Sequence, residues 1–357
     1  MTKTLKVGII GLGGIAHLHI GGWQTSEHTE VVAGCDITPA VFDQWDTEYG
    51  VKNLTTHAGD LINDPDIDII DICTPNKTHA DLTIAALDAG KHVLCEKPLA
   101  PTAEEIRRMI AARDRAGKTL MTAHHFRFTG TARALKAEID LGVLGDIYHA
   151  RAWWLRRAAV PLRPTFIYHK NSAGGVALDL GVHVLDLSLW FMGNPQPVAV
   201  TGIARTELAS QEGAFSVWDG DIPQGFDVDE FAAAFVRFAN GASFIIEASW
   251  MLHHNTDLED VQIWLYGAKG GGHWPDCVVC EANNVTKQHY NRTLKRTEGN
   301  LRAHYQECVE FAQAVVDGAP PPVPAEQSLQ VALILEALYQ SQRTGREVVI
   351  SETRRIS

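Results

Sequence analysis

The amino-acid sequence predicts two domains, an α/β domain with a doubly wound parallel sheet and a following α+β domain with a mainly antiparallel sheet. With 357 residues, the chain is longer than one ordinary hydrophobic core supports. In its first part, apolar strand-like runs alternate with helical segments, a pattern typical of parallel strands joined by helices. After Gly145 such runs follow one another without helices, which predicts antiparallel pairing. We place the domains at residues 1–125 and 126–357.

Composition and charge limit the possible partners. The net charge is -12 and the pI is about 5.7, so the chain lacks the basic surface that nucleic acids and anionic membranes attract. No apolar run reaches the ~18 residues of a membrane-spanning helix, and the N-terminal run is too short for a signal peptide. We therefore expect a cytoplasmic protein that binds neither nucleic acid nor membranes.

A glycine-rich turn follows the first predicted strand, Lys6 to Ile10, and opens a helix through Ile20. Its first glycine permits a tight turn, its second lets the backbone approach a pyrophosphate, and the small Ala16 lets helix pack on strand. The helix N-terminus then faces the phosphates. The residues assigned to cofactor binding here are Gly11, Gly13, Gly14 and Ile15.

The second predicted strand, Glu30 to Cys35, ends in Asp36, about 20 residues beyond the glycines. An acidic side chain at that distance accepts hydrogen bonds from the adenosine ribose of a dinucleotide. Ile37 and Thr38 follow, so no arginine is present to bind a 2′-phosphate. The sequence therefore favours NAD over NADP.

Two further motifs follow predicted strands of the first domain. Thr74-Pro75-Asn76 and His79 come after the strand at 67–73, and Glu96-Lys97-Pro98 comes after the strand at 92–95. The carboxyl ends of parallel strands meet at one edge of the sheet, where such folds bind ligands, so we expect both motifs and the glycine turn to converge there. An alternative for Asn76 and His79 is a role confined to turn formation and helix capping.

Further motifs extend this pattern along nearly the whole chain. They are His125-Phe126-Arg127 and the run Gly-Gly-Val-Ala-Leu-Asp-Leu-Gly-Val-His-Val-Leu-Asp from Gly174 to Asp186. With the motifs above, in this order and spacing, the chain resembles the glucose-fructose oxidoreductase and inositol dehydrogenase family, Gfo/Idh/MocA. The resemblance implies a Rossmann domain that binds NAD and a second domain whose large open sheet supports the substrate pocket and mediates oligomerisation. We therefore expect a homo-oligomer, a dimer or a tetramer.

The activity implied by the resemblance is hydride transfer between NAD and a hydroxyl-bearing carbon of a sugar, sugar derivative or cyclic polyol. The reaction needs a group that takes the hydroxyl proton, and histidine suits this near neutral pH. By resemblance, His183 transfers the proton, Lys97 polarises the oxygen or shares the proton, and Asp179 binds a substrate hydroxyl. Asp179 and His183 lie four residues apart on a predicted helix, so both project from one face. The cofactor is also assigned Thr74, Pro75, Asn76, His79, Glu96, Lys97, His125 and Arg127.

Aromatic and cationic side chains are frequent between the first strand of the second domain and Asp179. Sugar rings bind through an apolar face against an indole and through hydroxyls against arginine or acidic groups. Trp153 and Trp154 serve either this purpose or sheet packing, and a loop expected at 207–225 covers the pocket or joins a neighbouring subunit. The residues assigned to binding a carbohydrate or polyol are Lys97, Arg156, Arg163, Asp179 and His183.

No metal site is expected. Cys277 and Cys280 are spaced like a zinc or redox pair, but no second cysteine or histidine pair accompanies them at metal-ligand spacing. His124 and His125 are adjacent on an extended segment, so their side chains point to opposite faces. Asp186, one turn beyond His183, either orients the imidazole or lies solvated on the helix surface.

Two alternative functions remain open. One is an enzyme that retains its NAD and uses transient oxidation for epimerisation, elimination or glycoside cleavage. The other is a non-catalytic protein that senses nicotinamide nucleotides, although a binding module has no need for Lys97, Asp179 and His183 together. Helices expected at 301–316 and 328–343 complete the second domain as amphipathic cover.

Overall fold

The computed structural model describes residues 4–295 and 301–351. The chain divides into two compact units, one made of Met1–Phe128 with Leu301–Leu329 and the other of Thr129–Asn300 with Gln330–Ser357. The expected division at 1–125 and 126–357 therefore needs one correction, because a segment close to the C-terminus belongs to the first unit.

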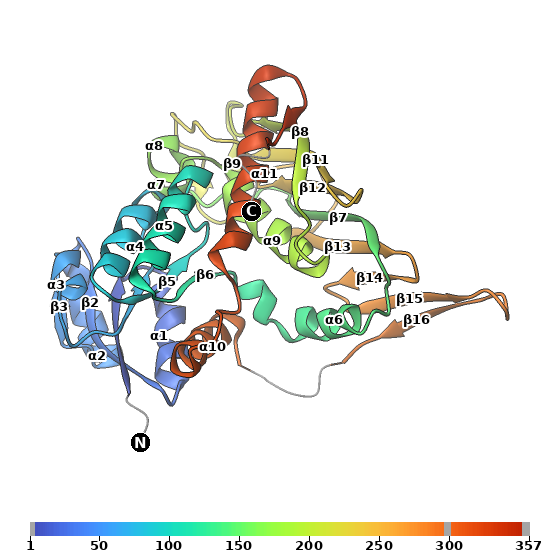
Figure 1. Ribbon diagram of the computed structural model, residues 1–357. Helices are drawn as coiled ribbons and strands as arrows, with labels where there is room; N and C mark the ends of the chain where they lie inside the picture. Colours follow the sequence, from blue (N-terminus) through green and yellow to red (C-terminus); the bar gives the residue numbers. More distant parts are fainter. Residues whose placement is uncertain (1–3, 296–300, 352–357) are drawn as a thin grey trace. The chain divides into compact units, whose positions relative to one another are not determined.

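The first unit is built on a six-stranded sheet in which every pair of neighbouring strands is parallel (Figure 1). The strand order is β3-β2-β1-β4-β5-β6, so the direction of winding reverses between β1 and β4. Ligands of doubly wound folds bind at the carboxyl ends of the strands beside this reversal. In chain order the strands are β1 (Leu5–Ile10), β2 (Thr29–Cys35), β3 (Asn53–Thr55), β4 (Ile69–Ile72), β5 (His92–Glu96) and β6 (Leu120–Ala123). The predicted doubly wound parallel sheet is confirmed.

Helices connect these strands, as the alternation predicted. The ends of α5 show how the sequence sets their limits: Thr102 and Glu105 form a capping box at its start, and Gly117 ends it in the left-handed conformation, with φ of 61°. The connecting helices are α1 (Ala16–Thr25), α2 (Phe42–Tyr49), α3 (Ala58–Ile62), α4 (His79–Asp88) and α5 (Ala103–Ala116).

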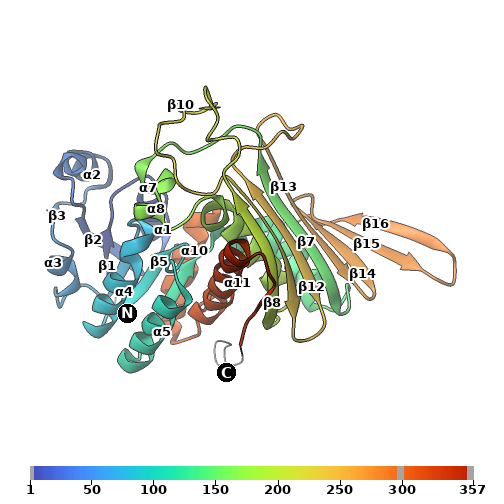
Figure 2. The same cartoon turned by 90° about the horizontal axis from the view of Figure 1, so that it is seen from above.

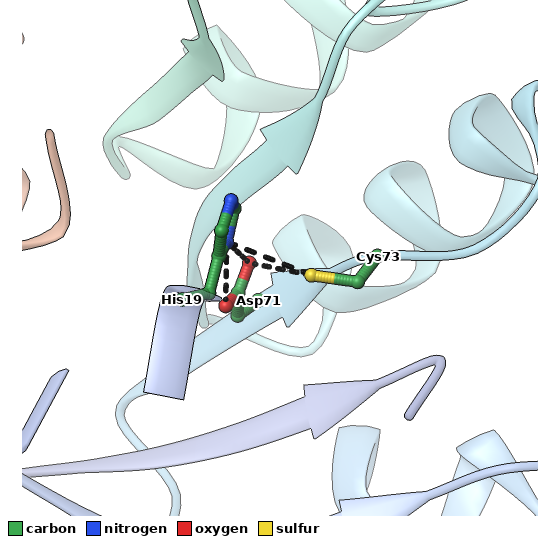
Figure 3. Close-up of side chains that lie close together, drawn as sticks. All are labelled: His19, Asp71 and Cys73. Atoms are coloured by element: carbon green, nitrogen blue, oxygen red, sulfur yellow. Dashed lines mark hydrogen bonds and ion pairs between the residues drawn. The ribbon is translucent and has the colours of Figure 1, made fainter. Parts of the chain in front are cut away.

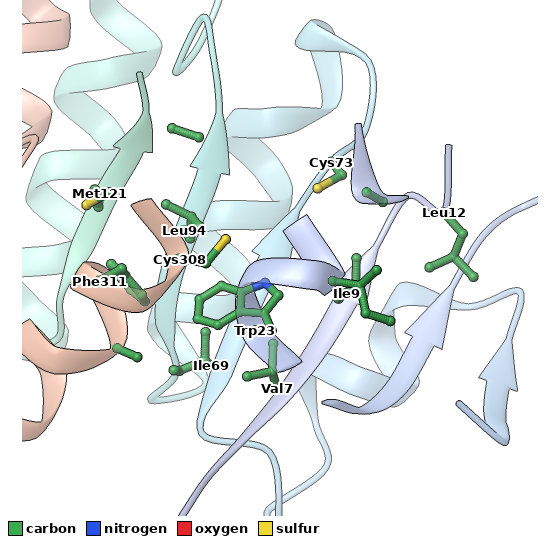
Figure 4. Packing of buried hydrophobic residues seen from close by; sticks show 14 of the residues in the cluster. Val7, Ile9, Leu12, Trp23, Ile69, Cys73, Leu94, Met121, Cys308 and Phe311 are labelled. Atoms are coloured by element: carbon green, nitrogen blue, oxygen red, sulfur yellow. The ribbon is translucent and has the colours of Figure 1, made fainter. Parts of the chain in front are cut away.

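Helix α10 (Ala303–Asp317) packs against α1, which explains the correction to the domain division. Gly21 and Gly22 give α1 a face without side chains, and a Cβ atom on Gly22 would lie 2.8 Å from Tyr305 Cα. The two helices therefore approach closely, and Cys308 and Phe311 of α10 join Trp23 in the buried core (Figure 4). The expectation that this helix covers the second domain is wrong.

The second unit is built on a nine-stranded sheet (Figure 2). Only β7 and β12 pair in parallel among its described strand pairs, and the others are antiparallel, so the predicted open, mainly antiparallel sheet is confirmed. The sequence did not predict the polar strands near residue 290, because every residue of β16 is exposed and shows no alternation. In sheet order the strands are β16 (Gln288–Thr293), β15 (Val278–Asn283), β14 (Gly270–Trp274), β13 (Glu259–Gly267), β7 (Ile147–Arg156), β12 (Ser243–Ser249), β11 (Phe231–Phe238), β8 (Pro197–Arg205) and β17 (Val348–Val349).

One face of this sheet is covered by α9 (Val182–Phe191), which a π-helical turn at Ala177–Gly181 precedes. Gly175 is required just before this turn, because a Cβ atom there would lie 1.9 Å from Asp229 O. Asp229 accepts hydrogen bonds from the backbone N–H groups of Gly175 and Ala177 and from the Tyr339 hydroxyl. The remaining helices are α6 (Gly130–Asp140), α7 (Pro164–Ile167), α8 (His169–Ser172) and α11 (Ala325–Thr344), of which α11 begins in the first unit.

Within the described residues, one helical stretch, His169–Phe191, has the length and hydropathy of a membrane span. In its apolar window, 89% is buried inside the protein, which is the environment of a core helix.

Candidate functional site

The glycine turn after β1 leaves room for a ligand at the start of α1. Gly11 has φ of 92°, and a Cβ atom there would lie 2.7 Å from the backbone of Cys73, so glycine alone lets the turn pack against the end of β4. A Cβ atom on Gly13 would meet nothing within 4 Å, and Gly13 and Gly14 are exposed. With Ile15 half-buried at the helix start, the turn fits a dinucleotide pyrophosphate.

Asp36 lies at the end of β2, beside the glycine turn. Its Oδ2 atom accepts a hydrogen bond from Leu12 N at 2.9 Å, and its Oδ1 atom accepts one from Thr38 N at 2.8 Å. These bonds fix a half-buried carboxylate next to the turn, as ribose recognition requires. The neighbouring Ile37 is 88% exposed and uncharged, so this position offers no positive charge to a 2′-phosphate.

His79 joins the loop after β4 to the turn after β5. Its ring nitrogens lie 2.8 Å from Pro98 O and 2.8 Å from Thr74 O, and burial lowers its pKa. Because the ring is 0% exposed, His79 acts by holding these two loops together, while Thr74, Pro75 and Asn76 line the surface at the end of β4. The glycine turn, the Thr74 loop and the Lys97 turn thus meet at one edge of the sheet.

Lys97 is half-buried in the turn directly after β5 and precedes a cis peptide bond to Pro98. Glu96 Oε2 accepts a hydrogen bond from Lys97 N at 2.8 Å. Burial alone would raise the pKa of Glu96, but the hydrogen bond and charge of His19, together with the charge of Lys97, lower it to about 2. Glu96 is therefore an ionised carboxylate that anchors the Lys97 backbone.

His125 lies in a short 3₁₀ turn after β6 and stacks on His304 of α10, with ring centroids 3.9 Å apart. Burial lowers the pKa of both rings, that of His304 to about 4. Arg127 is buried in the same turn and donates a hydrogen bond to Gln327, so it is held inside the first unit. His304 lies far from His125 along the chain, so no local motif predicts its contact with this turn.

In the second unit, Asp179 lies in the π-helical turn and His183 in the first turn of α9. Trp250 Nε1 donates a hydrogen bond to Asp179 Oδ2 at 3.0 Å, and the ring of His183 lies 5.7 Å from that of Trp154. π-Helical turns are rare and occur often at functional sites. Asp186 is 1% exposed, so its interpretation as a solvated surface residue is wrong.

Trp154 begins a chain of contacts that leads away from His183. Trp154 Nε1 and Arg156 Nε both donate to Glu259 Oε2, at 2.9 and 3.1 Å. The Arg156 guanidinium lies 5.3 Å from the centroid of Trp154 and 4.6 Å from that of Trp218. We call Trp154, Arg156, Glu259 and Trp218 the aromatic cluster. It combines indole faces with a cation and a carboxylate, the groups that sugar rings require.

Trp218 belongs to a hairpin of β9 (Phe215–Ser216) and β10 (Gly220–Asp221) within the loop expected at 207–225. Hydrogen bonds from Val217 N to Ala158 O and from Ser216 Oγ to Val160 O fix this hairpin to the segment after β7. The loop was expected from its composition but the position of Trp218 was not, because the segment that holds the hairpin lies more than 50 residues away in the chain.

The remaining predicted residues make other contacts. Trp153 points to the other face of β7 and donates to Asp260 at 2.7 Å. Arg163 is exposed at the start of α7. Cys277 donates to Thr131 O at 3.2 Å, and neither it nor Cys280 belongs to a group of three possible metal ligands in the described residues.

Comparison with known proteins gives consistent results along the chain. Residues 5–124 match the model of the oxidoreductase family with an NAD-binding Rossmann fold, and residues 132–272 match the GFO/IDH/MocA C-terminal domain. The D-glucoside 3-dehydrogenase of Escherichia coli is 30% identical over 97% of this chain and 98% of its own length. The myo-inositol 2-dehydrogenase of Thermotoga maritima is 27% identical over 98% and 99% of the two chains.

Among solved structures, a levoglucosan dehydrogenase in complex with NADH has a TM-score of 0.84 and 25% identity, covering 98% of this chain and 100% of that one. The glycine turn, the Thr74 loop, the Lys97 turn and both family matches agree, and the protein belongs to the Gfo/Idh/MocA family of oxidoreductases, with an NAD-binding Rossmann domain as its first unit.

Proposed function

We propose that the protein oxidises a hydroxyl-bearing carbon of a sugar, a sugar derivative or a cyclic polyol and transfers the hydride to NAD. The observation that carries the proposal is the meeting of the glycine turn, the Thr74 loop and the Lys97 turn at one sheet edge. Membership in an oxidoreductase family with sugar and polyol dehydrogenases supports it.

Asp36 selects NAD over NADP in this proposal. Its fixed carboxylate accepts hydrogen bonds from a ribose diol, and its negative charge repels a 2′-phosphate. The exposed turn at Gly13 and Gly14 holds the pyrophosphate. When bound, NAD supplies the hydride acceptor.

Lys97 and His183 handle the hydroxyl proton. The imidazole of His183 takes the proton as the carbon loses its hydride, and the Lys97 ammonium stabilises the negative charge that develops on the oxygen. Asp179, held by Trp250, accepts a hydrogen bond from a neighbouring substrate hydroxyl. The aromatic cluster binds the rest of a pyranose ring or its substituent.

We also propose that the protein forms a homo-oligomer through the face of the nine-stranded sheet opposite α9. Register places Arg151, Ile245 and Phe235 in one row across β7, β12 and β11 on this face. Ile203 of β8 is 41% exposed on the same face, and apolar side chains on an open sheet favour association.

Substitution of the proton-handling residues tests the proposed function. Lys97→Ala and His183→Ala are expected to lower kcat by at least ~100-fold while leaving the NAD dissociation constant nearly unchanged, because the glycine turn and Asp36 are assigned most of the contacts to the dinucleotide. Steady-state kinetics and fluorescence titration with NAD measure the two quantities. His57→Ala, which replaces an exposed histidine at the start of α3, is the control. An unchanged kcat or a loss of NAD binding in either variant would contradict the assignment.

A further inference from the structure

A buried polar cluster lies behind the Lys97 turn in the first unit. His19 of α1 is its centre, and Asp71 of β4, Glu96 of β5 and Glu307 of α10 surround it. His19, Asp71 and Glu307 are each 0% exposed. Figure 3 shows the Asp71 side of the cluster, where Cys73 also approaches the ring. Buried charges are costly unless they are paired and hydrogen-bonded, so the protonation of each group follows from its partners.

Both ring nitrogens of His19 contact carboxylates. Nδ1 lies 3.0 Å from Asp71 Oδ2 and 3.1 Å from Oδ1, and Nε2 lies 3.0 Å from Glu96 Oε1. Each carboxylate accepts from a second donor, Asp71 from Trp23 Nε1 at 2.7 Å and Glu96 from Lys97 N at 2.8 Å. Burial alone would lower the pKa of His19, but Cys73 and Asp71 raise it well above its ordinary value, and the pKa of Glu96 is lowered to about 2. Glu96 is therefore ionised, and the His19 ring donates from both nitrogens as an imidazolium.

Glu307 is a third carboxyl group beside the same ring. Its Oε1 atom lies 3.7 Å from His19 Nε2, and within the described part of the chain neither oxygen has a hydrogen-bond partner. The two negative charges of Asp71 and Glu96 already exceed the single positive charge of His19. An ionised Glu307 would therefore be an unpaired buried charge. Burial raises the pKa of Glu307 well above its ordinary value. Glu307 is therefore neutral in the folded protein.

We propose that His19 is a positioning residue for Lys97. Its imidazolium holds Glu96 in the orientation in which Glu96 accepts the Lys97 backbone N–H, and the neutral Glu307 leaves that ion pair undisturbed. The inference rests on the proposed role of Lys97 in proton handling. Without a donor at the Nε2 position of His19, Glu96 loses the hydrogen bond to its Oε1 atom and rotates, so the Lys97 turn loses its anchor.

A metal ion is the competing occupant of the same position. Ligand atoms of His19, Glu96 and Glu307 lie within 4.8 Å of one another. A metal on His19 Nε2 would replace the 3.0 Å hydrogen bond to Glu96 and require an ionised Glu307. We favour the proton, because that bond is already formed and all three side chains are buried.

Two substitutions of His19 separate its two contacts. Glutamine is long enough to place its amide nitrogen near the Nε2 position, whereas asparagine reaches only the Nδ1 position. His19→Asn is expected to lower kcat by about 10- to 100-fold at nearly unchanged KM, the effect of losing a charge-assisted hydrogen bond. His19→Gln is expected to recover most of the loss, and Glu307→Gln, which mimics a neutral carboxyl group, to keep the wild-type kcat.

Amide hydrogen exchange at Lys97 provides a readout that needs no substrate. The amide is expected to exchange faster in His19→Asn than in the wild type, and to be protected again in His19→Gln. If His19→Asn does not fold, the exchange rates in His19→Gln and Glu307→Gln still test the inference, because the Lys97 amide is expected to stay protected in both variants. Three results would each overturn the inference. They are an equal loss of kcat in both His19 variants, a loss of kcat in Glu307→Gln as large as that in His19→Asn, and a stoichiometric metal ion in the purified wild type. An active Lys97→Ala would instead overturn the proposed function itself.

Discussion

Several side chains in the first unit act by fixing backbone loops. His79 holds two loops through their carbonyl groups, Asp36 holds the glycine turn through Leu12 N, and Glu96 holds the Lys97 amide. Each of these polar groups lies at or shortly after the carboxyl end of a parallel strand, and these strand ends lie along one edge of the sheet. The sequence motifs therefore fix the backbone conformation of the loops and also supply the chemical groups of the site.

Asp36 is predicted to set the cofactor preference. Replacing Asp36 with Ser and Ile37 with Arg removes the repulsive carboxylate and supplies a cation for a 2′-phosphate, so the ratio of kcat/KM for NAD to that for NADP is expected to fall by at least ~10-fold. Steady-state kinetics with both cofactors measure this ratio. A ratio equal to that of the wild type would show that the ribose is recognised elsewhere.

The residues that the sequence analysis missed have partners far away in the chain. His19 meets Glu96 across 77 positions, and Ser216 fixes the Trp218 hairpin to Val160 across 56. Local motifs name residues that lie in or directly after a turn, such as Gly11 or Lys97. They carry no information on contacts between distant segments, so His19, His304 and Glu307 could not be found by spacing.

At the scale of elements, strands and their parallel pairing were easier to predict than helix partners. The alternating pattern of the first 123 residues predicted the parallel sheet, because buried strands form short apolar runs between glycines and polar turns. Helix α10 was assigned to the wrong domain. Its amphipathic pattern shows that one face is buried but does not identify the element that covers this face. Gly21 and Gly22 of α1 were the sequence feature that could have indicated a closely packed partner helix.

The β9–β10 hairpin is predicted to determine substrate affinity. Trp218→Ala removes the indole that stacks on Arg156, so KM for glycoside substrates is expected to rise by about 3- to 10-fold with little change in kcat, because Trp218 is not assigned to the reacting carbon. Trp218→Phe should retain most of the affinity. Phe215→Ala, an exposed aromatic residue on the same hairpin, is the control. An equal rise of KM in Phe215→Ala would mean that substrate affinity depends on the fold of the hairpin and not on the Trp218 side chain.

At the scale of the whole molecule, buried histidines predict how stability depends on pH. Burial lowers the pKa of His92 and His304 to about 4, against an ordinary value of 6.5. Between these values the unfolded chain binds protons that the folded chain does not, so the free energy of unfolding rises with pH across the window. Glu307 and Asp229, whose pKa values burial raises, oppose this trend, as does His19, whose pKa Cys73 and Asp71 raise although burial lowers it. The described histidines with lowered pKa outnumber them: His79, His92, His125, His149, His273 and His304.

We therefore expect the free energy of unfolding to fall as the pH decreases from 6.5 towards 4. Urea unfolding at several pH values measures the slope. His92→Asn keeps an acceptor for Thr119 N but cannot be protonated, so it should flatten the slope over this window. A slope unchanged in His92→Asn would contradict the assignment of the shift to this ring.

Hydride transfer from a carbohydrate or polyol to free NAD is the activity that we propose for this protein. The most direct test measures NADH absorbance on mixing the purified protein with NAD or NADP and a panel of hexoses, anhydro-sugars, glycosides and inositols, beside an assay of the denatured protein for bound nicotinamide. The account predicts reduction of free NAD by at least one panel member, with NADP reduced more slowly. Tightly held NAD without net reduction would contradict it and indicate a redox-neutral enzyme, and the absence of both signals would indicate a nicotinamide-sensing protein.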